Sequence, residues 1–213
     1  MTVKNKTYSP LEEKINVYSH ALGFLVSFIG AMFLIRKACL FGDLMQQISF
    51  SIYGLSMMTL FAASTLYHHA SDPHRRARLR IFDHAAIYVL IAGTYTPFCL
   101  VTLPEKTGLI VFAVVWVFAL VGIGIKLFFT GRFSVLSTLM YLFMGWMVIF
   151  IIKPLVQNLD IQGLYWLFSG GLAYTIGAIL YSIKKVPFNH ACFHILVLIG
   201  SFCHYMGIYL YVF

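Results

Sequence analysis

Apolar residues fill long blocks of the chain, and short polar breaks separate these blocks. A membrane-spanning helix needs about 20 mostly apolar residues, and seven segments meet this length. Gly42-Asp43, Asp72-Pro73 and Pro104-Glu105 are three of the breaks. A spanning strand takes only about 9–11 residues of alternating polarity, so strands do not fit the blocks. The seven predicted helices are residues 18–40, 46–68, 82–101, 108–129, 133–152, 163–183 and 189–213.

The composition supports a membrane protein. The 213 residues are 61% hydrophobic and 10% charged, whereas soluble domains are about 45–50% apolar and about 25% charged. We therefore predict an all-α integral membrane protein, a seven-transmembrane-helix bundle. It forms a single domain, residues 18–213, after a cytoplasmic N-terminal segment, residues 1–17. The net charge of +8 does not indicate nucleic-acid binding, because the cations lie in short loops, where the bilayer accounts for them.

The distribution of Lys and Arg predicts the orientation. Loops on the N-terminal side hold most of them, and positively charged loops stay in the cytoplasm. The N-terminus is therefore predicted to be cytoplasmic and the C-terminus outside. The cations on the N-terminal side are Lys4, Lys6, Lys14, Arg75, Arg76, Arg78, Arg80, Lys126, Arg132, Lys184 and Lys185, against Arg36, Lys37, Lys106 and Lys153 on the other side.

Three local patterns concern packing. Thr130-Gly131-Arg132 is a short link, so the fourth and fifth helices should be antiparallel neighbours. Ala173-x-x-x-Gly177 has the spacing of small residues at close helix contacts. The cysteines have no C-x-x-C pair and should be small buried apolar residues, not disulfides or a cysteine-based zinc site. They are Cys39, Cys99, Cys192 and Cys203.

The strongest chemical signal is His190-x-x-x-His194, at the head of the last apolar block. Two histidines four residues apart lie on one face of a helix, so both imidazoles can reach one metal ion. Imidazole is a good zinc ligand. Because ionisable groups are costly inside a membrane, their presence there indicates a function.

Further polar residues are predicted at the same depth. His68 ends the second helix, Ser64 lies one turn before it, and Asp83 begins the third helix. Three neutral histidines form a catalytic type of zinc site that leaves one position for water. Asp83 could hold that water as a general base or orient a histidine, and Ser64 could bond the water or a substrate oxygen. Such a site suits hydrolysis of a lipid amide or ester.

Each residue also has a purely structural interpretation. The histidine pair could hydrogen-bond a neighbouring helix, and His68 could sit at the membrane interface. Asp83 could pair with Arg80, and Ser64 could be a packing hydroxyl. Among the other histidines, His20 is a candidate supporting residue, and His204 lies about 15 Å past His194 along the helix, where it could line a cavity. His69 and His84 are expected at the interface, and His74 in solvent.

Four segments are distinctive in combination: Ser64-Thr65-Leu66-Tyr67-His68, Asp83-His84-Ala85-Ala86-Ile87-Tyr88, Ala92-Gly93-Thr94-Tyr95-Thr96-Pro97-Phe98 and His190-x-x-x-His194. Together they resemble the bacterial hemolysin III group of the progestin and adipoQ receptor family, which is related more distantly to alkaline ceramidases. The resemblance implies a Zn²⁺ cofactor bound by His68, His190 and His194. It also implies that Asp83 and Ser64 match the family's aspartate and serine. Phe193 stands where bacterial members often carry Trp.

The resemblance also bears on function. We expect a zinc-dependent hydrolase of a lipid amide or ester, ceramidase-like, in the cytoplasmic (inner) membrane of a bacterium, where it serves membrane-lipid homeostasis. A membrane lipid is the expected partner. One alternative is a non-catalytic sensor of bilayer state in which zinc is a structural clasp. Another is a pore-forming cytolysin, against which the very apolar composition argues.

Overall fold

A computed structural model describes residues 8–129, 134–183 and 185–213. Within these ranges the chain is helical and contains no strand. Seven helical stretches are long and apolar enough to cross a membrane, which confirms the predicted fold class. The elements are α1 (Pro10–Phe41), α2 (Leu44–His69), α3 (Pro73–Pro97), the π-helical turn η1 (Phe98–Thr102), α4 (Glu105–Phe129), α5 (Ser134–Trp146), the 3₁₀ turn η2 (Met147–Ile151), α6 (Ile152–Asn158), α7 (Ile161–Ser182) and α8 (Asn189–Tyr211).

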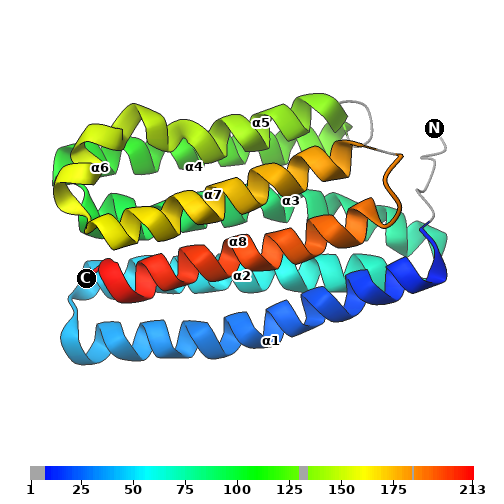
Figure 1. The fold of residues 1–213 in the computed structure, drawn as a ribbon, viewed down its shortest axis with the longest axis horizontal. Coiled ribbons are helices and arrows are strands. Elements are labelled where there is room, and N and C mark those ends of the chain that lie inside the picture. The colour runs from blue at the N-terminus through cyan, green and yellow to red at the C-terminus, as the bar shows by residue number, and fades with distance from the viewer. Residues whose placement is uncertain (1–7, 130–133, 184) are drawn as a thin grey trace.

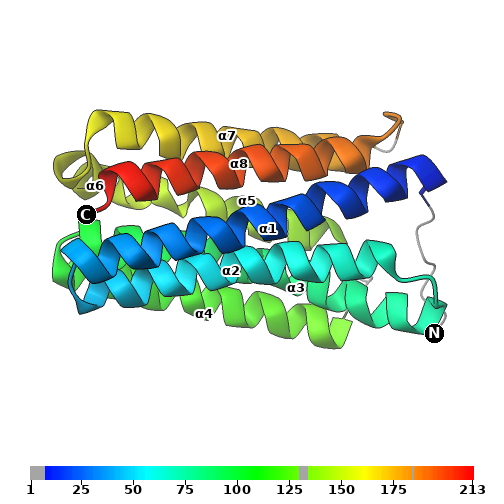
Figure 2. The ribbon, with the colours of Figure 1, turned by 90° about the horizontal axis from the view of Figure 1, so that it is seen from below.

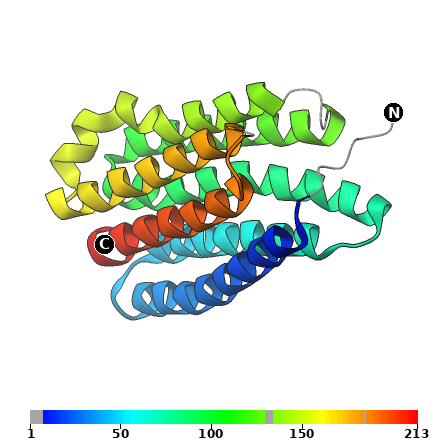
Figure 3. The same ribbon diagram turned by 45° about the vertical axis from the view of Figure 1, so that its right-hand side comes forward.

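The helices form a closed ring. Each packs on its neighbour in the order α1, α2, α3, α4, α5, α7, α8, and α8 returns to α1. Figures 1, 2 and 3 show the long helices running side by side, with the start of α1 and the C-terminus at opposite ends. With seven crossings, the end of α2 and the starts of α1, α3 and α8 share one end of the bundle, on the right in Figure 1. Which side of the membrane this end faces stays a prediction.

Two helices begin earlier than the apolar pattern predicted. α1 starts at Pro10 and not at residue 18, and α3 starts at Pro73 and not at residue 82. Both starts have a proline in the first turn and a capping side chain that accepts from the backbone, Ser9 for α1 and Asp72 for α3. Local capping therefore extends both helices beyond their apolar blocks.

Two spans change geometry near their middle or end. After Pro97 the third span continues as the turn η1. The fifth span is divided into α5, η2 and α6, and Pro154 explains this, because proline cannot donate to the carbonyl four residues earlier. The Tyr95 hydroxyl bridges the division, since it donates to the Gly145 carbonyl at 2.9 Å and accepts from the Val148 N–H at 2.8 Å.

The packing predictions have mixed outcomes. The link Thr130-Gly131-Arg132 lies outside the described residues, but α4 and α5 are neighbours as expected. A Cβ at Gly177 would lie 3.2 Å from Phe193 and Leu196 of α8, so this small residue does allow close approach.

All four cysteines are free, and Cys99 and Cys203 are buried. Burial was wrongly predicted for Cys39 and Cys192, which lie on the outer surface. A small apolar side chain is tolerated there because the surface of a spanning bundle faces an apolar solvent.

Candidate metal centre

Three histidine rings converge at one end of the bundle. His68 comes from the last turn of α2, and His190 and His194 come from the first turns of α8. The Nε2 atom of His190 lies 3.0 Å from Nε2 of His68 and 3.1 Å from Nε2 of His194. All three residues are at most 5% exposed, and one nitrogen from each lies within 4.8 Å of the others. The structure thus brings together the three residues that the sequence predicted, in a group that could hold a metal ion.

The donor set fits a zinc ion. With zinc–nitrogen bonds of about 2.1 Å, two ligand nitrogens of a tetrahedron lie about 3.4 Å apart, close to both observed separations. Hydrogen bonding between the rings explains the contacts less well, because an N–H on His190 Nε2 can point along only one of them. A cation at the centre would instead accept a lone pair from each ring.

Glu13 of α1 orients His68. Its Oε2 atom lies 2.7 Å from Nδ1 of His68, and its other oxygen is paired with Arg76 of α3. A carboxylate only accepts, so Nδ1 donates and the lone pair of His68 is left on Nε2, which faces the other histidines. Metal-binding histidines usually have such a carboxylate or carbonyl partner behind them.

The start of α8 is anchored from two sides. The side chain of Asn189 donates to the carbonyls of Leu180, Tyr181 and Ile183 at the end of α7. The Glu12 carboxylate accepts from the backbone N–H of His190 at 3.2 Å. An acidic side chain at a helix N-terminus satisfies an otherwise unpaired donor and complements the helix dipole.

Two aromatic rings from the N-terminal region cover the histidines. Tyr8 stacks on His190 with ring centroids 4.5 Å apart, and His20 stacks on His194 at 3.7 Å. Burial raises the pKa of the Tyr8 phenol, so this ring stays uncharged at neutral pH. Predicted as a supporting residue, His20 does lie against a histidine of the cluster.

Asp83 and Ser64 lie beside the cluster, as the sequence predicted. Both are buried, and Asp83 lies close to the Ser64 hydroxyl and to His68. The alternative in which Asp83 pairs with Arg80 is not seen, since no ion pair among the described residues joins these two side chains.

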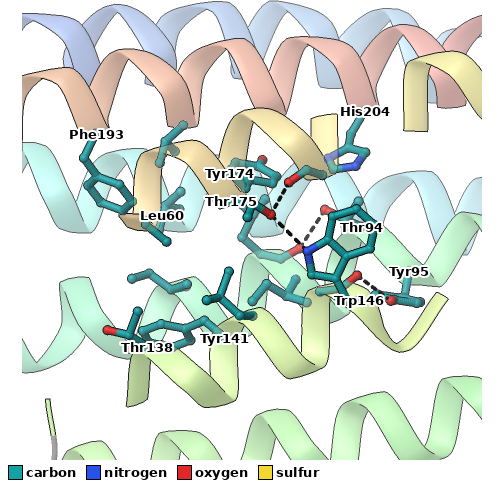
Figure 4. A pocket seen from close by; sticks show the side chains of 18 of the residues that line it. Leu60, Thr94, Tyr95, Thr138, Tyr141, Trp146, Tyr174, Thr175, Phe193 and His204 are labelled. Carbon is teal, nitrogen blue, oxygen red and sulfur yellow. Dashed lines mark hydrogen bonds between the residues drawn. The ribbon is translucent and has the colours of Figure 1, made fainter. Parts of the chain in front are cut away.

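A cavity of about 200 Å³ extends from this end into the ring of helices. Its polar lining includes Ser64, Asp83, His190 and His194, and the rest is largely apolar. Figure 4 shows side chains that line it, among them Trp146, whose Nε1 donates to the Thr175 hydroxyl at 2.9 Å. His204 lines the cavity as predicted, and its Nε2 lies 3.2 Å from the Leu167 carbonyl.

The remaining histidines divide into two groups. His69 and His74 are exposed, in agreement with their predicted interface and solvent positions. His84 was expected at the interface, but its side chain lines the cavity. The reason is that α3 begins at Pro73 and has the end of α4 and α5 beside it, so the first turns of the apolar block are covered by protein.

Sequence reasoning missed Tyr8, Glu12, Glu13 and Arg76. Treating residues 1–17 as a separate segment concealed the role of the first three, whereas α1 begins at Pro10 and packs against the site. Arg76 was missed because the third helix was predicted to begin at residue 82 and in fact begins at Pro73. A signal was present, since Glu13, Asn16 and His20 recur at helical spacing and place three polar groups on one face.

These observations define a class: a seven-helix membrane protein with a buried three-histidine site at one end of the bundle. The family model described as "Haemolysin-III related" matches residues 8–205, and the chain therefore belongs to this family. The chain is 46% identical to a "Hemolysin-3 homolog" of Bacillus subtilis (strain 168), with 89% of each chain covered. It is 42% identical to "Hemolysin-3" of Bacillus cereus, with 94% of this chain and 92% of the relative covered.

A human relative is more distant. The "Monocyte to macrophage differentiation factor" of Homo sapiens is 28% identical over 98% of this chain and 89% of its own length. The "Adiponectin receptor protein" of Drosophila melanogaster is 26% identical, and the match covers 49% of it. These matches agree with the resemblance to the progestin and adipoQ receptor family.

Proposed function

We propose that the protein is a zinc-dependent hydrolase of a lipid amide or ester that serves membrane-lipid homeostasis. His68, His190 and His194 are the metal ligands, Asp83 is the general base, and Ser64 supports the water or a substrate oxygen. The observation that supports this most is the shared cavity: Ser64 and Asp83 line the same largely apolar space as His190 and His194. A hydrocarbon chain could fill this space while its polar bond lies at the histidines.

In the proposed reaction, the metal and the side chains of the protein have different roles. Bound zinc supplies Lewis acidity and makes hydroxide available near neutral pH. Hydrolysis joins the oxygen of water to the carbonyl carbon and breaks the bond to nitrogen or oxygen. Asp83 takes the proton from water and returns it to the leaving group, and the Ser64 hydroxyl donates to the substrate carbonyl.

The proposed location is the cytoplasmic membrane of a bacterium, with the histidine site near the inner leaflet. The excess of Lys and Arg in the loops at the histidine end supports this orientation. Lys4, Lys6, Arg132 and Lys184 of that count lie outside the described residues. Lipid substrates would then enter from the surrounding bilayer.

The direct test replaces Asp83 with Asn, which keeps the shape of the side chain. Purified protein in liposomes is assayed with fluorogenic long-chain amides and esters, and its zinc is measured by mass spectrometry. We expect zinc to be retained and turnover to fall about 10²–10⁴-fold, the range for losing a general base. Unchanged turnover with zinc retained would contradict the assignment of Asp83.

One observation favours a structural clasp as the second candidate function. The histidines and Glu13 tie together four helices, α1, α2, α3 and α8. A clasp predicts that wild-type protein binds zinc, hydrolyses none of the test lipids, and loses thermal stability when zinc is removed.

The name of the Bacillus cereus relative suggests a third candidate, a pore. A leakage assay with dye-loaded liposomes distinguishes a pore from a hydrolase and from a structural clasp. A hydrolase or a clasp leaves them sealed, whereas a pore releases the dye.

A further inference from the structure

His204 lies in the wall of the cavity, far from the metal-binding histidines. It follows His194 by ten residues of α8, which is about 15 Å along the helix. It is 6% exposed and lines the same cavity as His190 and His194, and Figure 4 shows it among the lining side chains. We call the part of the cavity around His204 the far end. The proposed reaction does not use this side chain, although an ionisable group inside a spanning helix is costly.

Contacts with α7 fix the orientation of the His204 ring. Its Nε2 atom lies 3.2 Å from the carbonyl oxygen of Leu167. A Cβ at Gly170 would lie only 2.8 Å from the ring, so the absence of a side chain there lets the ring approach α7 this closely. The ring of Tyr174 follows one turn later, with the two ring centroids 5.3 Å apart. Successive turns of α7 therefore hold the ring in place.

The contact with Leu167 decides which ring nitrogen of His204 carries the hydrogen. A carbonyl oxygen only accepts, so Nε2 carries the hydrogen and donates it. Because a charge at this depth of a membrane is costly, the ring is neutral, and Nδ1 then has a lone pair and no hydrogen. Nδ1 is buried and has no hydrogen-bond partner among the described residues. His204 therefore offers an unused acceptor at the far end.

Other polar side chains that line the far end bond within the protein. The Trp146 N–H donates to the Thr175 hydroxyl, which itself donates to a backbone carbonyl of α7. The Thr94 hydroxyl donates to a backbone carbonyl of α3, and the Tyr174 hydroxyl lies 2.9 Å from a serine hydroxyl of α8. These four side chains have partners, which leaves the acceptor of His204 for a ligand.

The cavity limits what this ligand can be. A buried acceptor without a donor costs free energy, and a ligand that brings a donor recovers this cost. The wall of the cavity is largely apolar, which suits a hydrocarbon chain. The hydrocarbon core of a bilayer is about 30 Å thick, so one lipid chain spans about 15 Å, close to the rise of α8 from His194 to His204. A lipid whose polar bond lies at the metal site therefore brings the terminal half of its chain to His204.

We propose that Nδ1 of His204 accepts a hydrogen bond from a hydroxyl group in the terminal half of a lipid chain, so that the cavity selects hydroxylated chains. The inference rests on the proposed function, since it names the class of lipid that the same cavity takes. A ketone at the same carbon has only lone pairs and cannot donate to Nδ1. A hydroxyl close to the polar bond of the lipid does not reach His204.

The test compares ligands that differ in one oxygen group. Binding to purified, reconstituted protein is measured for 12-hydroxyoctadecanoic acid, 12-oxo-octadecanoic acid and the corresponding 6-hydroxy and 6-oxo acids. We expect the 12-hydroxy acid to bind at least about fivefold more tightly than the 12-oxo acid, the effect of one hydrogen bond whose loss leaves a buried acceptor unpaired. The ratio should be smaller for the 6-substituted pair.

Two results would overturn the proposal. One is equal binding of the 12-hydroxy and 12-oxo acids, which is expected if a bound water is the partner of Nδ1, because water can also donate to a ketone. The other is the same ratio at both positions of the chain, because the preference would then not come from the far end.

Two substitutions distinguish the two nitrogens of the His204 ring. In His204→Gln the amide N–H lies near the place of Nε2, so the bond to Leu167 can be kept while the acceptor at Nδ1 is lost. In His204→Asn the side-chain carbonyl lies near the place of Nδ1, and the bond to Leu167 is lost. We expect the preference for the 12-hydroxy acid to disappear in the Gln variant and to persist in part in the Asn variant.

The controls address folding and surface effects. His74→Gln makes the same exchange at an exposed histidine and should keep the full preference. Thermal unfolding and zinc content report whether each variant is folded. A folded His204→Gln protein that keeps the preference contradicts the assignment. So does a folded His204→Asn protein that loses the preference while the Gln variant keeps it, since His204 would then act only through its bond to Leu167.

The inference and the proposed function can fail separately. Asp83→Asn protein should lose turnover but keep its preference for the 12-hydroxy acid, because Asp83 lies at the metal end of the cavity. If wild-type protein hydrolyses lipids and shows no such preference, the inference is wrong and the proposed function stands. If the preference is present and no lipid is hydrolysed, the binding site at His204 stands and the hydrolase does not.

Discussion

The two ends of α8 are held by the same helix in opposite ways. At its start, Glu12 of α1 accepts from the backbone N–H of His190. At its end, Lys37 of α1 donates to the backbone carbonyl of Tyr209 at 2.7 Å. Negative charge at a helix N-terminus and positive charge at a C-terminus both complement the helix dipole. One long helix therefore caps its neighbour at both ends.

Only one of these ends needs a further explanation. Capping and a cation–π contact with Phe213 account for Lys37, whose ammonium lies 4.3 Å from the centre of that ring. At the other end, capping accounts for Glu12 but not for three converging imidazoles, nor for the carboxylate of Glu13 behind one of them. The difference shows that capping of helix termini explains the charges at both ends, whereas the three converging imidazoles at one end form a group that could hold a metal ion.

The largest effect should come from the ligands. His194→Ala removes one of three donors, and we expect bound zinc to fall from about one per chain to near zero, since a site with two histidines loses most of its affinity. Metal analysis after dialysis against a weak chelator measures this. His69→Ala is the control, because His69 is exposed one residue from His68. If the His194 variant binds as much zinc as the wild-type protein, the assignment of these histidines as metal ligands is wrong.

Glu13→Gln should have the next largest effect. The amide can still accept from Nδ1 of His68 but lacks the charge that strengthens the bond, so we expect zinc affinity to fall about 10–100-fold. Competition with a chelator of known affinity gives the number. Glu105→Gln, at an exposed acidic residue at the opposite end, should leave the affinity unchanged. An equal loss in both variants would mean that Glu13 acts only through overall charge.

Lys37→Met should have the smallest effect, and it should change the stability of the fold and not the binding of zinc. It removes the cap on α8 but keeps most of the apolar stem, so we expect a loss of about 1 kcal/mol, or about 2–4 °C in Tm. Zinc affinity should not change, because the end of α8 lies many turns from the histidines. Lys106→Met, at an exposed lysine at the same end, is the control. A clear loss of zinc in the Lys37 variant would show that the two ends are coupled.

The sequence predicted more of the site than of its support. His190 and His194 are neighbours in sequence, so helical periodicity alone placed them together. His68 was assigned to the same end because the length of each apolar block fixes where a span ends. Glu13 could not be assigned in this way, since its distance from His68 depends on how α1 crosses α2. Likewise, His84 faces the cavity only because α4 and α5 cover that side of α3.

By itself, the sequence determined the class of protein, the seven spans and the end of the bundle at which the polar residues gather. The physical reason is that hydrocarbon permits only helices with satisfied backbone groups, so length and polarity fix their ends. The tertiary structure alone decided how the three predicted rings face one another, which carboxylate stands behind His68, and which basic residues face the cavity. Those relations depend on side-chain packing between helices, and packing in an apolar solvent leaves no periodic signal along the chain.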